Sequence, residues 1–343
     1  MPHDRSIHVM LAVCTTIVVV GALYLARQIF VPVAFAIFII AIVWPLQRGL
    51  LTRLPTLLSL AITVFVTAMA IAVLLFLLVW GFGVVGQWLF RNTAKFQEFY
   101  AATVAWLDAH GIQAADFITQ YFDVGWITRA FQQLTGRLHG TVTFVLVTLV
   151  FLLLGLLEVP IAERKLAALG DRELGRSLNR ACTLIAAKFR RYMLVRTAMS
   201  VLTGVAIWGF LLFTGLELAT AWGVIAFALN YIPFVGPFVA TLFPSVFAIV
   251  QLQSWQGALV VFTGLNLIQF MIGSYLEPRI SGAALSMSPF LVLFSVFFWM
   301  LLWGLPGAFI GVPMMIALMA ICAQYQSSRW FSDLLSSEAD ATE

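Results

Sequence analysis

Long apolar runs separated by short polar stretches make up most of this 343-residue chain. About 20 consecutive apolar residues suffice for an α-helix to cross the hydrocarbon core of a membrane. The pattern predicts an all-α polytopic membrane protein with about eight transmembrane segments. A chain can span lipid only if its backbone N–H and C=O groups are all hydrogen-bonded within the protein, as they are in a helix. The predicted segments are 7–26, 29–46, 56–86, 141–161, 197–214, 218–250, 255–276 and 289–322.

The first segment follows Arg5, as the apolar core of a signal peptide would. It is longer than an ordinary signal core and lacks a small-x-small cleavage site, so we expect a retained first span.

The sixth segment contains residues that break helices. The stretch N-Y-I-P-F-V-G-P brings Pro233, Gly236 and Pro237 into a run that would otherwise be a smooth helix. Proline lacks the backbone donor, and glycine adopts φ values that other residues avoid, so we predict that the backbone leaves the helix here. Broken membrane helices of this kind often form the substrate or ion site of a transporter.

The eighth segment has two further groups of breakers. Gly304, Pro306 and Gly307 predict one break, and Gly311 with Pro313 predicts another. Two interrupted segments in one chain indicate a transporter's central site. The alternative is that these prolines only kink helices that face lipid.

Composition and charge support a membrane protein. Apolar residues make up 62% of the chain and charged residues 10%, whereas soluble domains have about 45–50% and about 25%. Nine of the nineteen Lys and Arg residues lie between Arg164 and Arg196. Such a basic stretch beside apolar spans is typical of a cytoplasmic surface near anionic lipid, and no nucleic-acid partner is expected.

This charge distribution predicts that the N-terminus is cytoplasmic, and the C-terminus with it. The predicted order is spans 1–3 (1–86), an extracytoplasmic helical region (87–140), span 4 (141–163), a cytoplasmic basic amphipathic helix (164–196), spans 5–8 (197–323) and a cytoplasmic polar tail (324–343). Two alternatives stay open for the last part. Segments six and eight either both cross the membrane or both re-enter as hairpins, and the Glu277 turn is external in the first case and cytoplasmic in the second.

The basic helix has an apolar face at spacings of three and four, formed by Ala181, Ile185, Phe189 and Tyr192 among others. The arginines, Arg190 included, are predicted to point the opposite way. The helix is expected to pack under the bundle; a role as a sensor of lipids or partners is the alternative.

Motifs of enzyme chemistry are not found. There is no H-E-x-x-H metal motif and no phosphate-binding loop, so no enzyme activity, cofactor or metal site is expected. Any active transport must then use an ion gradient, which directs attention to acidic residues near the membrane: Glu158, Glu217 and Glu277. Glu277 is the strongest candidate, because it follows an apolar run and has a possible partner in Arg279.

Three motifs carry a family resemblance: N-Y-I-P-F-V-G-P at 230–237, E-P-R-I-S-G at 277–282, and W-G-L-P-G-A-F-I-G-V-P at 303–313. In order and spacing they resemble the autoinducer-2 exporter family of bacterial permeases. The resemblance implies an inner-membrane, homo-oligomeric exporter, linked either to autoinducer-2 or to sodium/proton exchange.

We therefore predict a secondary transporter, driven by an ion gradient, that exports a small polar solute. Its alternatives are a monovalent cation/proton antiporter, with Glu277 and Arg279 in ion coupling, and a non-transporting scaffold. The predicted translocation residues are Asn230, Tyr231, Pro233, Gly236, Pro237, Asn266 and Gln269. Asn266 and Gln269 have a structural alternative, which is hydrogen bonding between helices.

The predicted orientation is tested by labelling. In a chain without Cys14, Cys182 and Cys322, a cysteine at Ala115 should react with an impermeant thiol reagent from outside, and one at Ala168 only from inside. Opposite labelling of the two positions would contradict the orientation.

Overall fold

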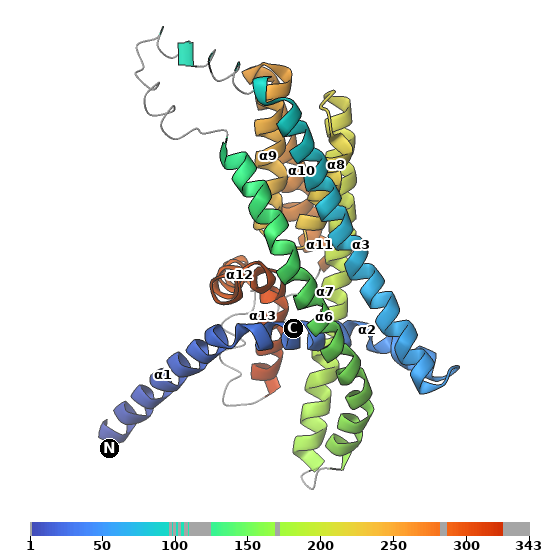
Figure 1. Ribbon diagram of the computed structural model, residues 1–343. Helices are drawn as coiled ribbons and strands as arrows, with labels where there is room; N and C mark the ends of the chain where they lie inside the picture. The colour runs from blue at the N-terminus through green and yellow to red at the C-terminus, as the bar shows by residue number, and fades with distance from the viewer. Residues whose placement is uncertain are drawn as a thin grey trace. The chain divides into compact units, whose positions relative to one another are not determined.

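The computed structural model describes residues 2–95, 98, 101, 104–105, 109, 125–168, 172–281 and 287–324. Every element in this part is a helix, which confirms the predicted all-α class (Figure 1). The elements are α1 (Pro2–Leu25), α2 (Arg27–Leu51), α3 (Thr56–Arg91), α6 (Gly125–Ala167), α7 (Arg172–Phe213), α8 (Ala219–Leu229), α9 (Val235–Leu252), α10 (Trp255–Gln269), the π-helix η1 (Phe270–Leu276), α11 (Glu277–Ser281), α12 (Pro289–Trp303) and α13 (Leu305–Gln324).

Seven of the described helical stretches are long and apolar enough to cross a membrane. The apolar parts of α1, α8 and α12 are shorter. The predicted tail at 324–343 lies outside the described residues, apart from Gln324. Ala115, in the predicted extracytoplasmic region 87–140, also lies outside them. The predicted boundaries at 140 and 196 lie inside the continuous helices α6 and α7.

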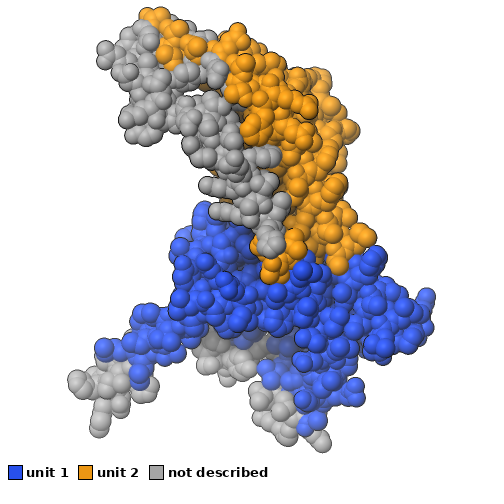
Figure 2. Space-filling model, in the orientation of Figure 1, with its two compact units in different colours: residues 1–67, 144–192, 283–343 blue, residues 68–143, 193–282 orange. Residues whose placement is uncertain are grey.

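The chain divides into two compact units, coloured separately in Figure 2. Unit 1 comprises residues 1–67, 144–192 and 283–343, and unit 2 comprises residues 68–143 and 193–282. In unit 1, apolar side chains of α2, α3 and α6 form a core around Ala36, Leu60 and Leu152.

Unit 2 has the larger core, made by the end of α3 together with α7, α8, α9 and α10. A close approach of two glycines tightens it. Gly204 on α7 faces Gly223 on α8, and a Cβ built at either glycine would come within 2.9 Å of the other's carbonyl oxygen. Small residues at such a crossing let membrane helices pack backbone to backbone.

The sixth segment is a helical hairpin within unit 2. Helices α8 and α9 fold back against each other, and the Trp222 and Phe247 rings meet at 5.7 Å on opposite sides of the turn. Helix α8 has 11 residues, or about 16 Å, and is too short to cross a hydrocarbon core of about 30 Å alone.

The eighth segment is also a hairpin. It reverses at Gly304, whose φ of 70° glycine adopts readily. Across the turn, the Ser295 hydroxyl donates to the Gly311 carbonyl at 2.6 Å. A Cβ on Gly307 would lie 1.9 Å from the Trp299 carbonyl oxygen, so only glycine fits this approach.

The second break predicted in this segment is wrong. Helix α13 continues through Gly311 and Pro313. An interior proline costs about 3 kcal/mol in an isolated helix. Here Pro313 is fully buried, and the packing of α13 against α12 outweighs that cost.

The basic part of α7 has the predicted apolar face, with Ala181, Phe189 and Tyr192 buried. Arg190 is an exception to the prediction that the arginines point away from the protein. It is half-buried and donates to the Ala41 carbonyl of α2 at 3.1 Å. The guanidinium thereby ties this part of α7 to α2 within unit 1.

The glycine contact of the second hairpin gives a testable prediction. A leucine side chain at Gly311 would collide with the backbone of Ser295, which approaches to 2.9 Å. We expect Gly311→Leu to destabilise the protein by about 1–3 kcal/mol, the usual cost of overpacking. Thermal unfolding in detergent measures this. The control is Gly21→Leu, since Gly21 on α1 has open space around it; equal melting temperatures of the two variants would contradict the prediction.

Candidate substrate site

The candidate site is the turn of the first hairpin, where the backbone leaves the helix as predicted. Helix α8 ends at Leu229, and α9 begins at Val235. Phe234 has a φ of 62°, which is unusual for a residue with a side chain. Pro233 is buried within this turn, and Pro237 is half-buried in the first turn of α9.

Gly236 is needed for the shape of the turn. A Cβ at this position would lie 2.1 Å from the Leu229 carbonyl oxygen and 2.9 Å from the Asn230 Cα. Both are backbone atoms, which cannot move aside as a flexible side chain can. Glycine therefore lets the first turn of α9 lie directly against the end of α8.

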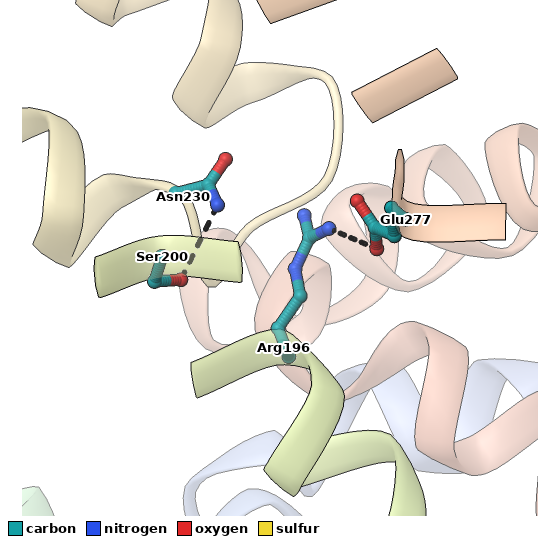
Figure 3. A network of polar contacts seen from close by, with 4 residues as sticks. All are labelled: Arg196, Ser200, Asn230 and Glu277. Atoms are coloured by element: carbon teal, nitrogen blue, oxygen red, sulfur yellow. Dashed lines mark hydrogen bonds and ion pairs between the residues drawn. The ribbon is translucent and has the colours of Figure 1, made fainter. Parts of the chain in front are cut away.

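Two side chains of the turn bond to α7. The Asn230 amide donates to the Ser200 hydroxyl at 3.3 Å, and the Tyr231 hydroxyl donates to the Thr197 hydroxyl at 3.1 Å. Asn230, Tyr231 and Ser200 are all buried. These bonds join the broken segment to a polar part of α7; Figure 3 shows the bond between Asn230 and Ser200.

An ion pair lies one turn away along α7. The Arg196 guanidinium donates to the Glu277 carboxylate at 2.7 Å. The Arg196 side chain is 6% exposed and that of Glu277 is 23% exposed. In Figure 3 this pair lies beside the Asn230–Ser200 pair, so an amide, a hydroxyl and a neutralised charge pair occur together.

The predicted pairing of Glu277 with Arg279 is replaced by this contact. Glu277 opens α11 and reaches α7, whereas the Arg279 guanidinium lies 4.0 Å from the Tyr275 ring centroid. Positions two apart on a helix point in different directions, so an E-P-R spacing does not favour a pair within the helix.

The two candidates on α10 differ in their environment. Asn266 is exposed and donates to the Phe262 carbonyl of its own helix at 2.8 Å. Gln269 is half-buried, and its amide nitrogen has no hydrogen-bond partner within the described residues. Only Gln269 thus has a buried polar group available to a ligand.

Sequence reasoning missed Arg196, Thr197 and Ser200 as residues of the site. Arg196 was counted only as the last cation of the basic stretch. A usable signal was present, since polar residues at 196, 200 and 203 recur at helical spacing inside an apolar span. The π-helix η1, which leads into Glu277, was also missed; π segments are frequent at functional sites.

The other acidic candidates take no part in the hydrogen bonds described above. Glu217 is exposed at the α7–α8 turn, accepts a hydrogen bond from the Trp88 indole, and its backbone N–H donates to Gln251 at 2.7 Å. Glu158 is exposed on α6. Among the described residues, no three His, Cys, Asp or Glu side chains are grouped so as to hold a metal ion.

A polytopic helical protein whose backbone breaks beside a buried polar network has the architecture of a membrane transport protein. Residues 13–327 match the protein family described as AI-2E family transporter, and the chain belongs to this family.

Three relatives illustrate the similarity, and all are named as transport proteins. The chain is 28% identical to the AI-2 transport protein TqsA of Escherichia coli K12 over 324 residues, which is 93% of each protein. It is 26% identical to YhhT of the same strain over 326 residues, covering 91% of this chain and 89% of YhhT. It is 30% identical to a protein of Borreliella burgdorferi over 212 residues, 61% of this chain and 57% of that protein.

The close backbone packing at Gly236 predicts that adding a single methyl group there impairs transport. We expect Gly236→Ala to insert into the membrane normally and to lower the transport rate at least about tenfold, because the turn must shift to relieve a backbone clash. The matched control is Gly209→Ala on α7, where a Cβ meets nothing. Transport rates of the purified variants in liposomes test this prediction. If both variants transport at the wild-type rate, the turn is not part of the transport site.

Proposed function

We propose that the protein is a secondary transporter, driven by an ion gradient, that exports a small polar solute similar to autoinducer-2. The observation that carries the proposal is the break at residues 230–234, which bonds to two polar side chains of α7, the buried Ser200 and the exposed Thr197. Membership in a family of transport proteins supports it, and so does similarity to a relative named as an AI-2 transport protein.

The proposed location is the bacterial inner membrane, with both termini in the cytoplasm. The basic stretch 164–196 supports this orientation, because positive charge accumulates on the cytoplasmic side. The two hairpins then favour re-entrant segments at positions six and eight, with Glu277 toward the cytoplasm. We further propose a homo-oligomer; the many exposed apolar side chains provide surface for subunit contacts as well as for lipid.

A cation/proton antiporter is the second candidate function, and one observation favours it. Glu277 is the one carboxylate bonded into the polar contacts described around the break. A carboxylate inside a transport site is the ordinary carrier of protons in such exchange. Its bond to Arg196 counts against this function, because the arginine already supplies the counter-charge that a cation would have to replace.

The Glu277→Gln variant distinguishes the two functions. In a solute exporter, it should lower but not abolish counterflow of autoinducer-2 in proteoliposomes. In an antiporter, it should eliminate proton movement that depends on Na⁺ after a pH jump. Glu158→Gln, which changes an exposed carboxylate, serves as the control and should alter neither measurement. Na⁺-dependent proton movement without any solute counterflow by the wild-type protein would overturn the proposed export.

The ion pair also has a stability consequence. Removing one partner of a buried pair leaves the other charge uncompensated. Because Glu277 keeps some exposure, we expect Glu277→Gln to cost about 1–3 kcal/mol, below the roughly 3–5 kcal/mol of a fully buried pair. The double variant Arg196→Met/Glu277→Gln should be more stable than either single variant in thermal unfolding. If the loss of unfolding free energy in the double variant equals the sum of the losses in the two single variants, the two side chains do not act as a pair.

A further inference from the structure

Helix α7 has a buried polar stripe inside an otherwise apolar span. Arg196, Ser200 and Thr203 recur at spacings of four and three and therefore share one face of the helix. Their exposed fractions are 5%, 0% and 0%. The stripe ends at Ile207 and Leu211, which are fully buried and apolar. The polar section is thus two helical turns long, or about 10 Å.

Two atoms of this stripe have no hydrogen-bond partner within the described residues: Arg196 Nε and Thr203 Oγ1. A buried polar atom without a partner destabilises the folded protein, because it has lost its hydrogen bonds to water. Other buried threonine hydroxyls avoid this cost by bonding to a carbonyl of their own helix. Thr63, for example, donates to the Ser59 carbonyl at 3.0 Å.

Helix α10 contributes a third such atom, Gln269 Nε2. Helices α7 and α10 with η1 pack together through a small apolar cluster of Val195, Met199 and Ile272. Ile268, the neighbour of Gln269, packs against the same cluster. Two helices in contact thus each have buried polar atoms with no hydrogen-bond partner in the part of the chain that the structure describes.

The chemistry of these groups defines what they can bind. The guanidinium Nε–H and the amide N–H₂ are donors, and a hydroxyl both donates and accepts. The charge of Arg196 is balanced by Glu277, so the cluster offers little net attraction to a free anion or cation. Its complement is an uncharged molecule with several hydroxyl or carbonyl oxygens.

We propose that the α7 stripe of Arg196, Ser200 and Thr203, together with Gln269, is the surface that the transported solute contacts, and that this solute is a small neutral polyhydroxylated compound. The inference rests on the proposed export function and moves the main solute contacts from the α8–α9 turn to α7. The turn then positions the stripe, because Asn230 bonds to Ser200.

Thr203→Val tests the stripe because it removes only a hydroxyl that bonds to no described residue. The variant should melt no lower than the wild-type protein, while its KM for autoinducer-2 counterflow in proteoliposomes rises about tenfold, the loss of one hydrogen bond. Thr63→Val is the matched control, since Thr63 is equally buried but its hydroxyl bonds within α3. The control should keep the wild-type KM. An unchanged KM in Thr203→Val would refute the proposal that the stripe contacts the solute.

Competition tests the solute class. An excess of ribose, a neutral polyol, should inhibit autoinducer-2 counterflow, whereas lactate and Na⁺ at equal concentration should not. Inhibition by lactate or Na⁺ instead of ribose would overturn the neutral class. Failure of the wild-type protein to transport autoinducer-2, ribose, lactate or Na⁺ would instead refute the proposed export function, and the stripe with it.

Discussion

Polar groups buried among apolar helices must find partners inside the protein, because lipid offers no hydrogen bonds. The break after α8 creates this requirement by taking the backbone out of the helix at Asn230 and bringing polar side chains into the core. Helix α7 meets it with Thr197, the residue after Arg196, and with Ser200, one turn from Arg196. The same helix binds Glu277 at the end of η1. Two segments of unit 2, the α8–α9 turn and the start of α11, are therefore held by hydrogen bonds to one section of α7.

The sequence predicted the parts of the fold that depend on local chemistry. Prolines and glycines marked both hairpin turns, and the breaks occur at residues 230–234 and at Gly304. Pro313 was predicted to break a helix and does not, since whether an interior proline ends a helix depends on the packing around it. That packing comes from α12, and residue types along α13 do not reveal it.

The candidate site shows the same limit more clearly. Asn230, Tyr231 and Gly236 could be chosen from the sequence because they lie in the broken segment itself. Their partners on α7 are about 30 residues away, and Glu277 bonds to a residue 81 positions distant. Such pairs depend on how helices cross, which a single sequence does not specify. The E-P-R motif drew attention to Arg279, while the structure gives Glu277 to Arg196 and places Arg279 over Tyr275.

The two hairpins have similar sequence signals but different interiors. At Gly304 the turn is closed by backbone contact: Gly307 lies against the Trp299 carbonyl, and Ser295 bonds to the Gly311 carbonyl. Just before this turn, the Trp303 indole donates to the Leu23 carbonyl of α1 at 3.2 Å. The α8–α9 turn bonds to α7 through Asn230 and Tyr231. On α7, Arg196 Nε and Thr203 Oγ1 have no hydrogen-bond partner among the described residues. Helix breakers alone therefore do not identify a candidate transport site; the polar groups of the helix to which the turn bonds must be considered as well.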